Sequence, residues 1–255
     1  MGRVLIITGM HRSGTSLVAS YLERAGLDIG RDLLGPDVGN PKGYFEDARM
    51  HDIHLEMLRR HGVGDGFTVD DEDIPLPVDE RDVTLAEEAV LPRLNLAQWG
   101  WKEPRTALFL DLWKRVLPEA NYLFLVRPPL AVLDSLLRRA SNDSVRTQPV
   151  RGLQLWRSHN AEMKRFTDAN PASCMWWTAE GFVRQPQRLI EMLRVRFGLD
   201  LAAPAFDDIF DADAFHTAVR SRARMVAATN RAEAKRCKQL YEDVLVLAEP
   251  SMQTG

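Results

Sequence analysis

The first 25 residues constrain the fold more than any other part of the chain. Residues 4–8 form a short apolar run typical of a buried strand, and residues 9–16 form a turn that contains two glycines. Apolar residues then recur with helical spacing over residues 14–25, before Gly26 ends the pattern. A strand, a glycine turn and a helix N-terminus direct several backbone N–H groups at one point. The segment therefore predicts an anion-binding site.

The rest of the chain continues this alternation of strands and helices. Further strands are predicted at residues 121–126 and 174–178, with a weaker one at 99–102. Helices are predicted at residues 49–60, 85–98, 107–116, 130–139, 153–167 and 186–197. The alternation predicts the α/β class, as a three-layer sandwich with a short central parallel sheet and helices on both faces. We expect one domain over residues 1–255, with 40–98 as a possible lid or acceptor region and 201–255 as a helical cap.

The turn differs from a nucleoside triphosphate loop at one decisive position. The spacing from Gly9 to Gly14 matches the first half of the pattern G-x-x-x-x-G-K-[ST], but Thr15 stands where that pattern has lysine. The cation lies instead at Arg12, three residues earlier. A kinase or NTPase that lacks the usual lysine is therefore an alternative, and so is an ordinary strand-to-helix turn.

A second candidate anion site follows the strand at residues 121–126. Arg127 comes directly after this strand, where α/β proteins form their ligand crevice, and Ser135 lies within reach on the helix that follows. The alternative is an ion pair between Arg127 and Asp134, with Ser135 as an ordinary helix residue. If both anion sites exist, we expect Arg12 and Arg127 to face one crevice from opposite flanks.

Several segments resemble one enzyme family. Arg-Ser-Gly-Thr-Ser at residues 12–16 resembles the 5′-phosphosulfate loop of sulfotransferases that use 3′-phosphoadenosine 5′-phosphosulfate (PAPS), and Leu-Val-Arg followed by Ser135 resembles their 3′-phosphate segment. Residues 101–105 resemble a Lys-Asp-Pro-Arg segment of bacterial and tyrosyl-protein sulfotransferases, with Glu103 in place of Asp. Residues 40–47 and 182–199 resemble two further family segments. The late basic loop of other branches has only one candidate here, residues 220–224.

The resemblance implies a set of site residues for sulfuryl transfer from PAPS, as co-substrate, to an acceptor hydroxyl or amine. The implied catalytic residues are Arg12, Glu46 and Lys102; the implied donor-binding residues are His11, Arg12, Ser13, Gly14, Thr15, Ser16, Arg127 and Ser135. Glu46 is the expected general base, because burial would raise its pKa. Its rivals are His11, His51, His54 and Asp47, although Asp47 also suits a helix cap and His51 with His54 could be mistaken for metal ligands.

Composition limits the remaining function classes. A net charge of −3 argues against a nucleic-acid-binding protein, and the two distant cysteines favour a reducing compartment. Without a long apolar run or a leader segment, we expect a cytoplasmic protein with no membrane span. No metal is expected, and a non-catalytic nucleotide-binding protein is a second alternative. The acceptor class stays open between glycan, lipid, peptide and small metabolite, although an acidic run over residues 65–88 weakly disfavours a polyanionic glycan.

Overall fold

The computed structural model describes residues 2–35, 43–64, 74–138, 143–207, 209 and 218–253. The predicted lid region therefore lies partly outside the described residues, at 40–42 and at 65–73, and so do parts of the predicted cap.

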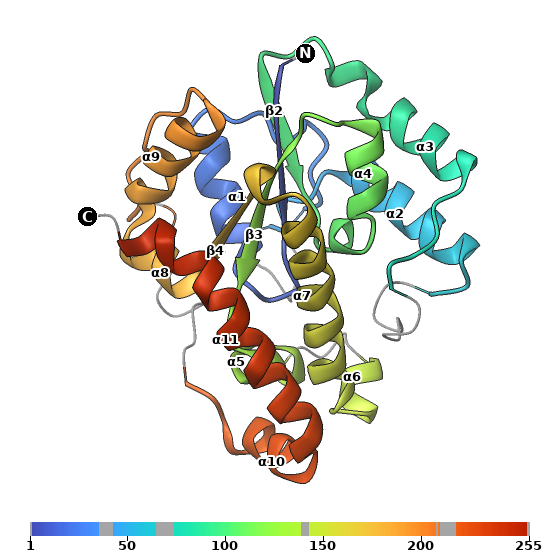
Figure 1. Cartoon of the computed structure of the whole chain (residues 1–255), viewed down its shortest axis with the longest axis vertical. Helices are drawn as coiled ribbons and strands as arrows, with labels where there is room; N and C mark the ends of the chain where they lie inside the picture. The colour runs from blue at the N-terminus through green and yellow to red at the C-terminus, as the bar shows by residue number, and fades with distance from the viewer. Residues whose placement is uncertain are drawn as a thin grey trace.

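Four strands of the described chain form one parallel sheet (Figure 1). They are β1 (Arg3–Thr8), β2 (Gln98–Lys102), β3 (Asn121–Val126) and β4 (Cys174–Thr178). Their order across the sheet is β2-β1-β3-β4, and every neighbouring pair is parallel. Ile7 pairs with Lys102, Thr8 with Phe124, and Val126 with Thr178. Because the pairs keep this register, the carboxyl ends of all four strands meet at one edge of the sheet.

Helices cover both faces of the sheet. They are α1 (Thr15–Arg24), α2 (Ala48–Arg60), α3 (Glu80–Val90), α4 (Leu110–Val116), α5 (Pro129–Arg138), α6 (Asp143–Thr147), α7 (Arg151–Ala169), α8 (Ala179–Arg184), α9 (Pro186–Phe197), α10 (Ser221–Thr229) and α11 (Arg231–Gln253). Short 3₁₀ turns lie at Leu91–Arg93, Pro104–Leu108 and Pro171–Ser173. In Figure 1, α1, α8 and α9 lie on one side of the sheet and α2, α3, α4 and α7 on the other.

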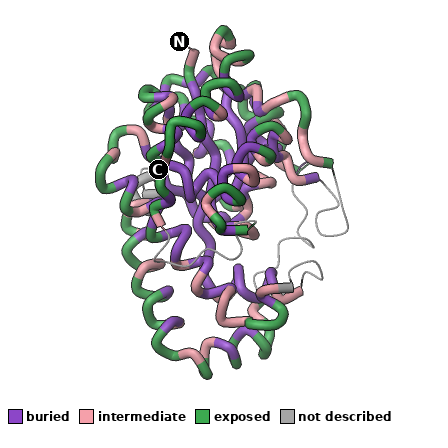
Figure 2. Tube along the Cα trace, turned by 90° about the vertical axis from the view of Figure 1, so that its right-hand side faces the viewer, coloured by how far each residue is buried: buried purple, intermediate pink, exposed green. Residues whose placement is uncertain are grey.

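Alternating side chains of each strand supply two separate cores. Leu5 and Ile7 of β1 pack with α1, α8 and α9, whereas Val4 and Ile6 pack with the helices of the opposite face. The strands are almost entirely buried, and buried backbone runs through the middle of the molecule in Figure 2. Burial on both faces is why these strands read as continuous apolar runs in the sequence. The predicted three-layer α/β sandwich is confirmed.

The C-terminal helices extend the second layer beyond the carboxyl edge of the sheet. Helix α11 lies against α7 and β4, and α10 lies against α5. In Figure 1, α10 lies at the end of the molecule beyond α5 and α6, and α11 runs from there toward α8. A hydrogen bond also joins this part to α5, where the N–H of Arg220 donates to Asp134 Oδ1 at 3.0 Å.

Several helix boundaries differ from the sequence prediction. The helix expected at residues 85–98 begins at Glu80, because Asp79 and Asp82 form a reciprocal capping box. It ends at Val90, where Pro92 converts the chain to a 3₁₀ turn before β2. A 3₁₀ turn also occupies the start of the helix expected at 107–116, so that α4 begins at Leu110. Helices α6 and α8 are too short for apolar periodicity to predict them.

Candidate functional site

The residues that follow the four strands gather at the carboxyl edge of the sheet. The loop over residues 9–14 follows β1, Lys102 ends β2, Arg127 follows β3, and Glu180 begins α8 just after β4. Side chains at these positions, together with the side chains that contact them, make two groups. The β3 cluster contains Arg12, Ser135, Arg127 and Glu180; the β2 cluster contains Glu46, Lys102, Glu103, Arg105 and His54.

Two glycines give the loop after β1 its close fit against the sheet. A Cβ atom on Gly9 would lie 2.4 Å from the carbonyl oxygen of Leu125 in β3, so only glycine allows this approach. Gly14 has a φ of 86°, in the left-handed region, and its Cα faces the Ala179 side chain at the start of α8. The loop is therefore held between β3 and α8.

The centre of the loop carries backbone strain at a charged residue. Arg12 has a φ of 70°, which non-glycine residues adopt at a cost of about 1 kcal/mol or more. The Ser13 N–H closes the turn by donating to the Met10 carbonyl at 3.1 Å. The turn aims the Arg12 side chain toward α5, where its Nε donates to Ser135 Oγ at 2.9 Å.

Polar groups of the loop and of the first turn of α1 remain available to an anion. Gly14 is the N-cap and supplies no side-chain acceptor, so the N–H groups of Thr15 and Ser16 have no partner within the helix. The hydroxyl of Ser13 is fully buried and has no hydrogen-bond partner among the described residues. A buried hydroxyl without a partner is costly, and an oxygen-rich ligand in the loop would satisfy it.

Arg127 joins the loop to the end of β3. Its Nη1 donates to the Arg12 carbonyl at 3.4 Å, its Nε lies 3.6 Å from Glu180 Oε1, and its own carbonyl accepts from Trp156 Nε1 at 3.0 Å. Burial lowers the pKa of the Arg127 guanidinium, and the Glu180 carboxylate opposes that shift. Arg127 thus contacts the loop that carries Arg12, and the two residues lie next to each other rather than on opposite flanks of a crevice. No sequence motif predicts Glu180 as a site residue, because its position depends on how β4 leads into α8.

The alternative ion pair between Arg127 and Asp134 is not what the structure shows. Asp134 pairs with Arg138 one helical turn further on, at 3.0 Å, and accepts the Arg220 N–H. The basic segment that begins at Arg220 therefore starts beside the helix that carries Ser135.

On the other side of the edge, Lys102 and Glu46 form a buried ion pair. Lys102 Nζ donates to Glu46 Oε1 at 2.7 Å, and the lysine side chain is fully buried. Burial lowers the pKa of Lys102, while the Glu46 carboxylate raises it. The structure thus brings two of the three predicted catalytic side chains into direct contact, from elements 56 residues apart.

Glu46 is fixed by the residues on either side of it. Phe45 has a φ of 53°, and Asp47 is the N-cap of α2, where it accepts from the Met50 N–H at 3.2 Å. Asp47 also accepts from Arg93 Nη1 at 3.2 Å, and Arg93 Nη2 donates to the carbonyls of Asp28 and Gly100 at 2.8 Å. Asp47 is therefore a structural cap, as its sequence position suggested. Sequence reasoning missed Arg93, since its partners come from three distant segments.

The histidines differ in their suitability as bases. His11 is half-buried in the loop; burial, followed by the nearby Arg105 guanidinium, holds its pKa well below the usual range, so its ring is neutral near pH 7 but is a weaker base than an exposed histidine. His51 bonds the adjacent Asp52 at 3.0 Å. His54 is fully buried, with Nε2 accepting from Trp113 Nε1 and Nδ1 3.0 Å from Glu103 Oε2, which excludes it as a base for an acceptor.

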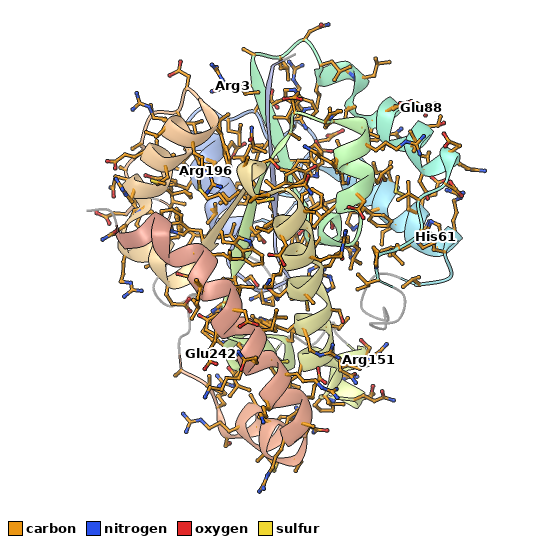
Figure 3. All side chains as sticks on the ribbon, in the orientation of Figure 1. Arg3, His61, Glu88, Arg151, Arg196 and Glu242 are labelled. Atoms are coloured by element: carbon orange, nitrogen blue, oxygen red, sulfur yellow. The ribbon has the colours of Figure 1, made fainter. Side chains whose placement is uncertain are left out.

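Asp79, Glu80 and Asp82, in the described part of the acidic run, pair with bases of their own layer. Glu80 bonds Arg115 of α4 at 2.9 Å, and Asp82 bonds both Arg60 and His61 at the end of α2. Glu88 points outward from α3, at the periphery of the molecule (Figure 3). Glu80 and Asp82 therefore hold α3 against its neighbours. This weakens the expectation that the run disfavours an anionic acceptor.

Two features are absent from the described residues. These residues contain no group of three His, Cys, Asp or Glu side chains placed to hold a metal ion. None of their helices combines the length and the apolar character that crossing a membrane requires.

Comparison with known proteins identifies the family. Residues 5–204 match the sequence model of the Sulfotransfer_3 family, described as the sulfotransferase family. The structure is similar to sulfotransferase STF1 from Mycobacterium tuberculosis H37Rv, with 15% identity, a TM-score of 0.55 and coverage of 90% of this chain and 72% of that chain. It is also similar to sulfotransferase STF9 from Mycobacterium avium, with 15% identity, a TM-score of 0.54 and coverage of 96% and 76%.

No curated protein matches the sequence. The two structural likenesses identify the fold as the P-loop-like α/β fold of sulfotransferases. Since the family match extends over most of the sequence, the chain belongs to the sulfotransferase family.

Proposed function

We propose that the protein transfers the sulfuryl group of PAPS to a hydroxyl or amine of its acceptor. Family membership supports sulfuryl transfer in general. The observation that carries the choice of donor is the hydrogen bond between Arg12 Nε and Ser135 Oγ. It joins the loop after β1 to the helix after β3, so two anion-binding segments meet within the length of one nucleotide.

The residues present fit a donor with an anionic group at each end. The loop offers the first-turn N–H groups of α1 and the buried Ser13 hydroxyl to a 5′-phosphosulfate. Arg127 and Ser135 suit a 3′-phosphate, because a guanidinium and a hydroxyl both donate to phosphate oxygens. In this proposal His11, Gly14, Thr15 and Ser16 complete the loop contacts through their backbone.

The chemistry places negative charge where this chain has its cations. Sulfuryl transfer breaks the bond between sulfur and the bridging phosphate oxygen, and that oxygen gains charge as the bond breaks. We infer that Arg12 and the N–H groups of residues 14–16 stabilise this charge, which is usually the largest source of catalysis in such sites. Lys102 supplies a second cation from the end of β2.

Glu46 is the proposed general base. Its carboxylate stands at the sheet edge beside Lys102, so an acceptor hydroxyl bound there would lose its proton to Glu46 as it attacks sulfur. His11 is the rival, because its neutral imidazole lies in the loop itself. Asp47 is engaged by the α2 N-terminus and by Arg93, which makes it a support for Glu46.

The class of the acceptor stays open between glycan, lipid, peptide and small metabolite. We propose further that residues 1–255 act as one catalytic domain, with residues 40–98 forming the acceptor side and 201–255 capping α5 and α7. A cytoplasmic location remains an expectation from the sequence.

Titration calorimetry tests the donor. Adenosine 3′,5′-bisphosphate should bind without Mg²⁺, whereas ATP with Mg²⁺ should bind much more weakly. The reverse order would favour a nucleotide kinase. A mass-spectrometric screen of cell extract with labelled PAPS then tests turnover. Tight bisphosphate binding with no labelled product in any extract would favour a non-catalytic nucleotide-binding protein.

A further inference from the structure

Glu180 is the acidic member of the β3 cluster. Its carboxylate lies beside Arg127, with Oε1 3.6 Å from Nε, and its side chain is 29% exposed, whereas the side chain of Arg127 is 7% exposed. The proposed function assigns Arg127 to the 3′-phosphate of the donor. A carboxylate next to a phosphate site calls for a physical reason, because two anions at short distance repel each other.

The position of Glu180 is fixed by the way β4 leads into α8. Val126 of β3 pairs with Thr178 of β4, so the residues that follow the two strands start side by side. The Thr178 hydroxyl accepts from the Gly181 N–H at 2.9 Å, which caps the start of α8. This turn holds Ala179 against the loop that follows β1. Glu180 therefore lies one residue from a direct contact with the loop.

Arg127 meets Glu180 and the loop through different nitrogens. Its Nε faces the Glu180 carboxylate, whereas its Nη1 donates to the Arg12 carbonyl at 3.4 Å. Its own carbonyl accepts from Trp156 Nε1 at 3.0 Å, which fixes the backbone from which the side chain extends. Because the N–H groups of a planar guanidinium point in different directions, a phosphate that binds on the side of the loop leaves the carboxylate in place.

The Glu180 carboxylate keeps acceptor capacity for a ligand. A carboxylate offers about four lone-pair sites, and a separation of 3.6 Å is longer than a hydrogen bond. Within the described residues, the ion pair with Arg127 is the only one that Glu180 makes. Asp134 of α5 differs, because it is almost fully buried, pairs with Arg138 at 3.0 Å and accepts a backbone N–H from the start of the cap. Glu180 is thus the carboxylate that a ligand at Arg127 can reach.

The donor carries a group that a carboxylate recognises, directly beside its 3′-phosphate. The ribose 2′-hydroxyl is attached to the neighbouring carbon, and a hydroxyl donates strongly to an ionised carboxylate. We propose that Glu180 accepts the 2′-hydroxyl while Arg127 holds the 3′-phosphate, a specificity-determining role that rests on the proposed function. The same carboxylate repels a phosphate at the 2′ position. Glu180 thereby selects a ribose that carries its phosphate at the 3′ position and a free hydroxyl at the 2′ position.

Calorimetry with three nucleotides separates this role from the function on which it rests. The ligands are adenosine 3′,5′-bisphosphate, its 2′-deoxy analogue and adenosine 2′,5′-bisphosphate. Wild type should bind the 2′-deoxy analogue about tenfold more weakly than the first ligand, because a hydrogen bond to a charged group is lost. The 2′,5′-bisphosphate should bind about 100-fold more weakly. If wild type fails to bind the 3′,5′-bisphosphate, the proposed function falls. If it binds the ribose and 2′-deoxyribose ligands equally well, only the role of Glu180 is overturned.

Two variants assign the preference to the Glu180 carboxylate. Glu180→Gln keeps the shape and removes the charge, so the preference for the ribose ligand should fall to about threefold. The same variant should bind the 2′,5′-bisphosphate about tenfold better relative to the 3′,5′-bisphosphate, because the repulsion is gone. Glu180→Ala should bind the ribose and 2′-deoxyribose ligands equally. Glu191→Gln, at an exposed carboxylate on α9 that bonds Arg188 at 3.0 Å, is the matched control and should keep every wild-type affinity ratio.

The ratios between ligands distinguish recognition from structural support. Support of Arg127 alone would make both Glu180 variants weaken all three ligands by the same factor, and that result would overturn the proposal. A wild-type preference for ribose that persists in Glu180→Ala would overturn it as well, because another group would then hold the 2′-hydroxyl. Should Glu180→Ala not fold, Glu180→Gln decides alone, since an unchanged ratio of 2′,5′- to 3′,5′-bisphosphate affinity in that variant would contradict the repulsion.

Discussion

The two clusters at the carboxyl edge are built in opposite ways. In the β3 cluster, Arg12 bonds Ser135 at 2.9 Å, but two contacts of Arg127 measure 3.4 and 3.6 Å and Arg12 is only half-buried. In the β2 cluster, Lys102–Glu46 and Glu103–Arg105 meet at 2.7 Å and are buried throughout. The first arrangement leaves room for ligand oxygens to improve its geometry; the second is already complete. We infer that the β2 cluster is pre-organised and that the β3 cluster tightens on the donor.

The largest effect should come from breaking the β2 cluster. Lys102→Met leaves the Glu46 carboxylate buried without its cation, which should lower the free energy of unfolding by about 3–5 kcal/mol. Urea denaturation measures it. Lys114→Met, at a lysine that bonds only a neighbouring carbonyl on the surface of α4, is the control. The double variant Lys102→Met/Glu46→Met should recover much of the loss. Equal stability of Lys102→Met and the control would contradict the contrast between the clusters.

Breaking the β3 cluster should instead affect catalysis. Arg12→Ala should reduce sulfuryl transfer by about 10²–10³-fold, because it removes one cation from the developing charge. Its melting temperature should stay near that of wild type, since the side chain is half-buried and the backbone strain at position 12 remains. Labelled PAPS measures transfer, with Arg24→Ala at the exposed end of α1 as control. A variant that keeps full activity would remove Arg12 from the site.

Low pH should selectively destabilise the packing around the β2 cluster. His159 is buried against this cluster, and burial lowers its pKa to about 4 from the usual 6.5. Between these values the unfolded chain binds a proton that the folded chain does not, so the free energy of unfolding falls as pH falls, by up to about 3 kcal/mol. Between pH 7 and pH 4, the free energy of unfolding of His159→Gln should fall by up to about 3 kcal/mol less than that of wild type. Denaturation curves at each pH measure this, and His51→Gln is the control. Parallel curves for wild type and His159→Gln would contradict it.

The smallest of these effects concerns the bond that joins the two anion segments. Ser135→Ala removes the acceptor for Arg12 Nε, at a cost of about 1 kcal/mol, or a roughly fivefold weaker affinity for adenosine 3′,5′-bisphosphate. Calorimetry measures the change. Ser173→Ala, at the opposite end of the sheet, should leave the affinity unaltered. An unchanged affinity in Ser135→Ala would mean that the Arg12–Ser135 contact does not form part of the donor site.

The sequence predicted those parts of the fold that depend on local pattern. All four strands, the loop after β1 and the position of Arg127 follow from apolar runs and glycine spacing, and the structure agrees with them. The predicted start of α3, at residue 85, was wrong. Asp79 and Asp82 form a capping box, and this outweighs the apolar periodicity.

The partners of the site residues could not be predicted in the same way. Glu180, Arg93 and the His54–Trp113 pair reach the site through tertiary packing, and no spacing in the sequence links them to it. Even Glu46 was chosen by resemblance, whereas its contact with Lys102 spans two elements and needs the register of β2. Residue types indicate what chemistry is available, but only packing decides which groups meet.

The left-handed backbone at Arg12 has a consequence for how this protein tolerates change. A glycine or asparagine would adopt that conformation at lower cost than arginine, so either substitution should raise the melting temperature slightly. Selection of random variants for heat resistance alone should therefore enrich glycine and asparagine at position 12 and yield inactive molecules. The arginine persists against its own backbone preference, as expected where a trade-off between durability and turnover is resolved in favour of turnover.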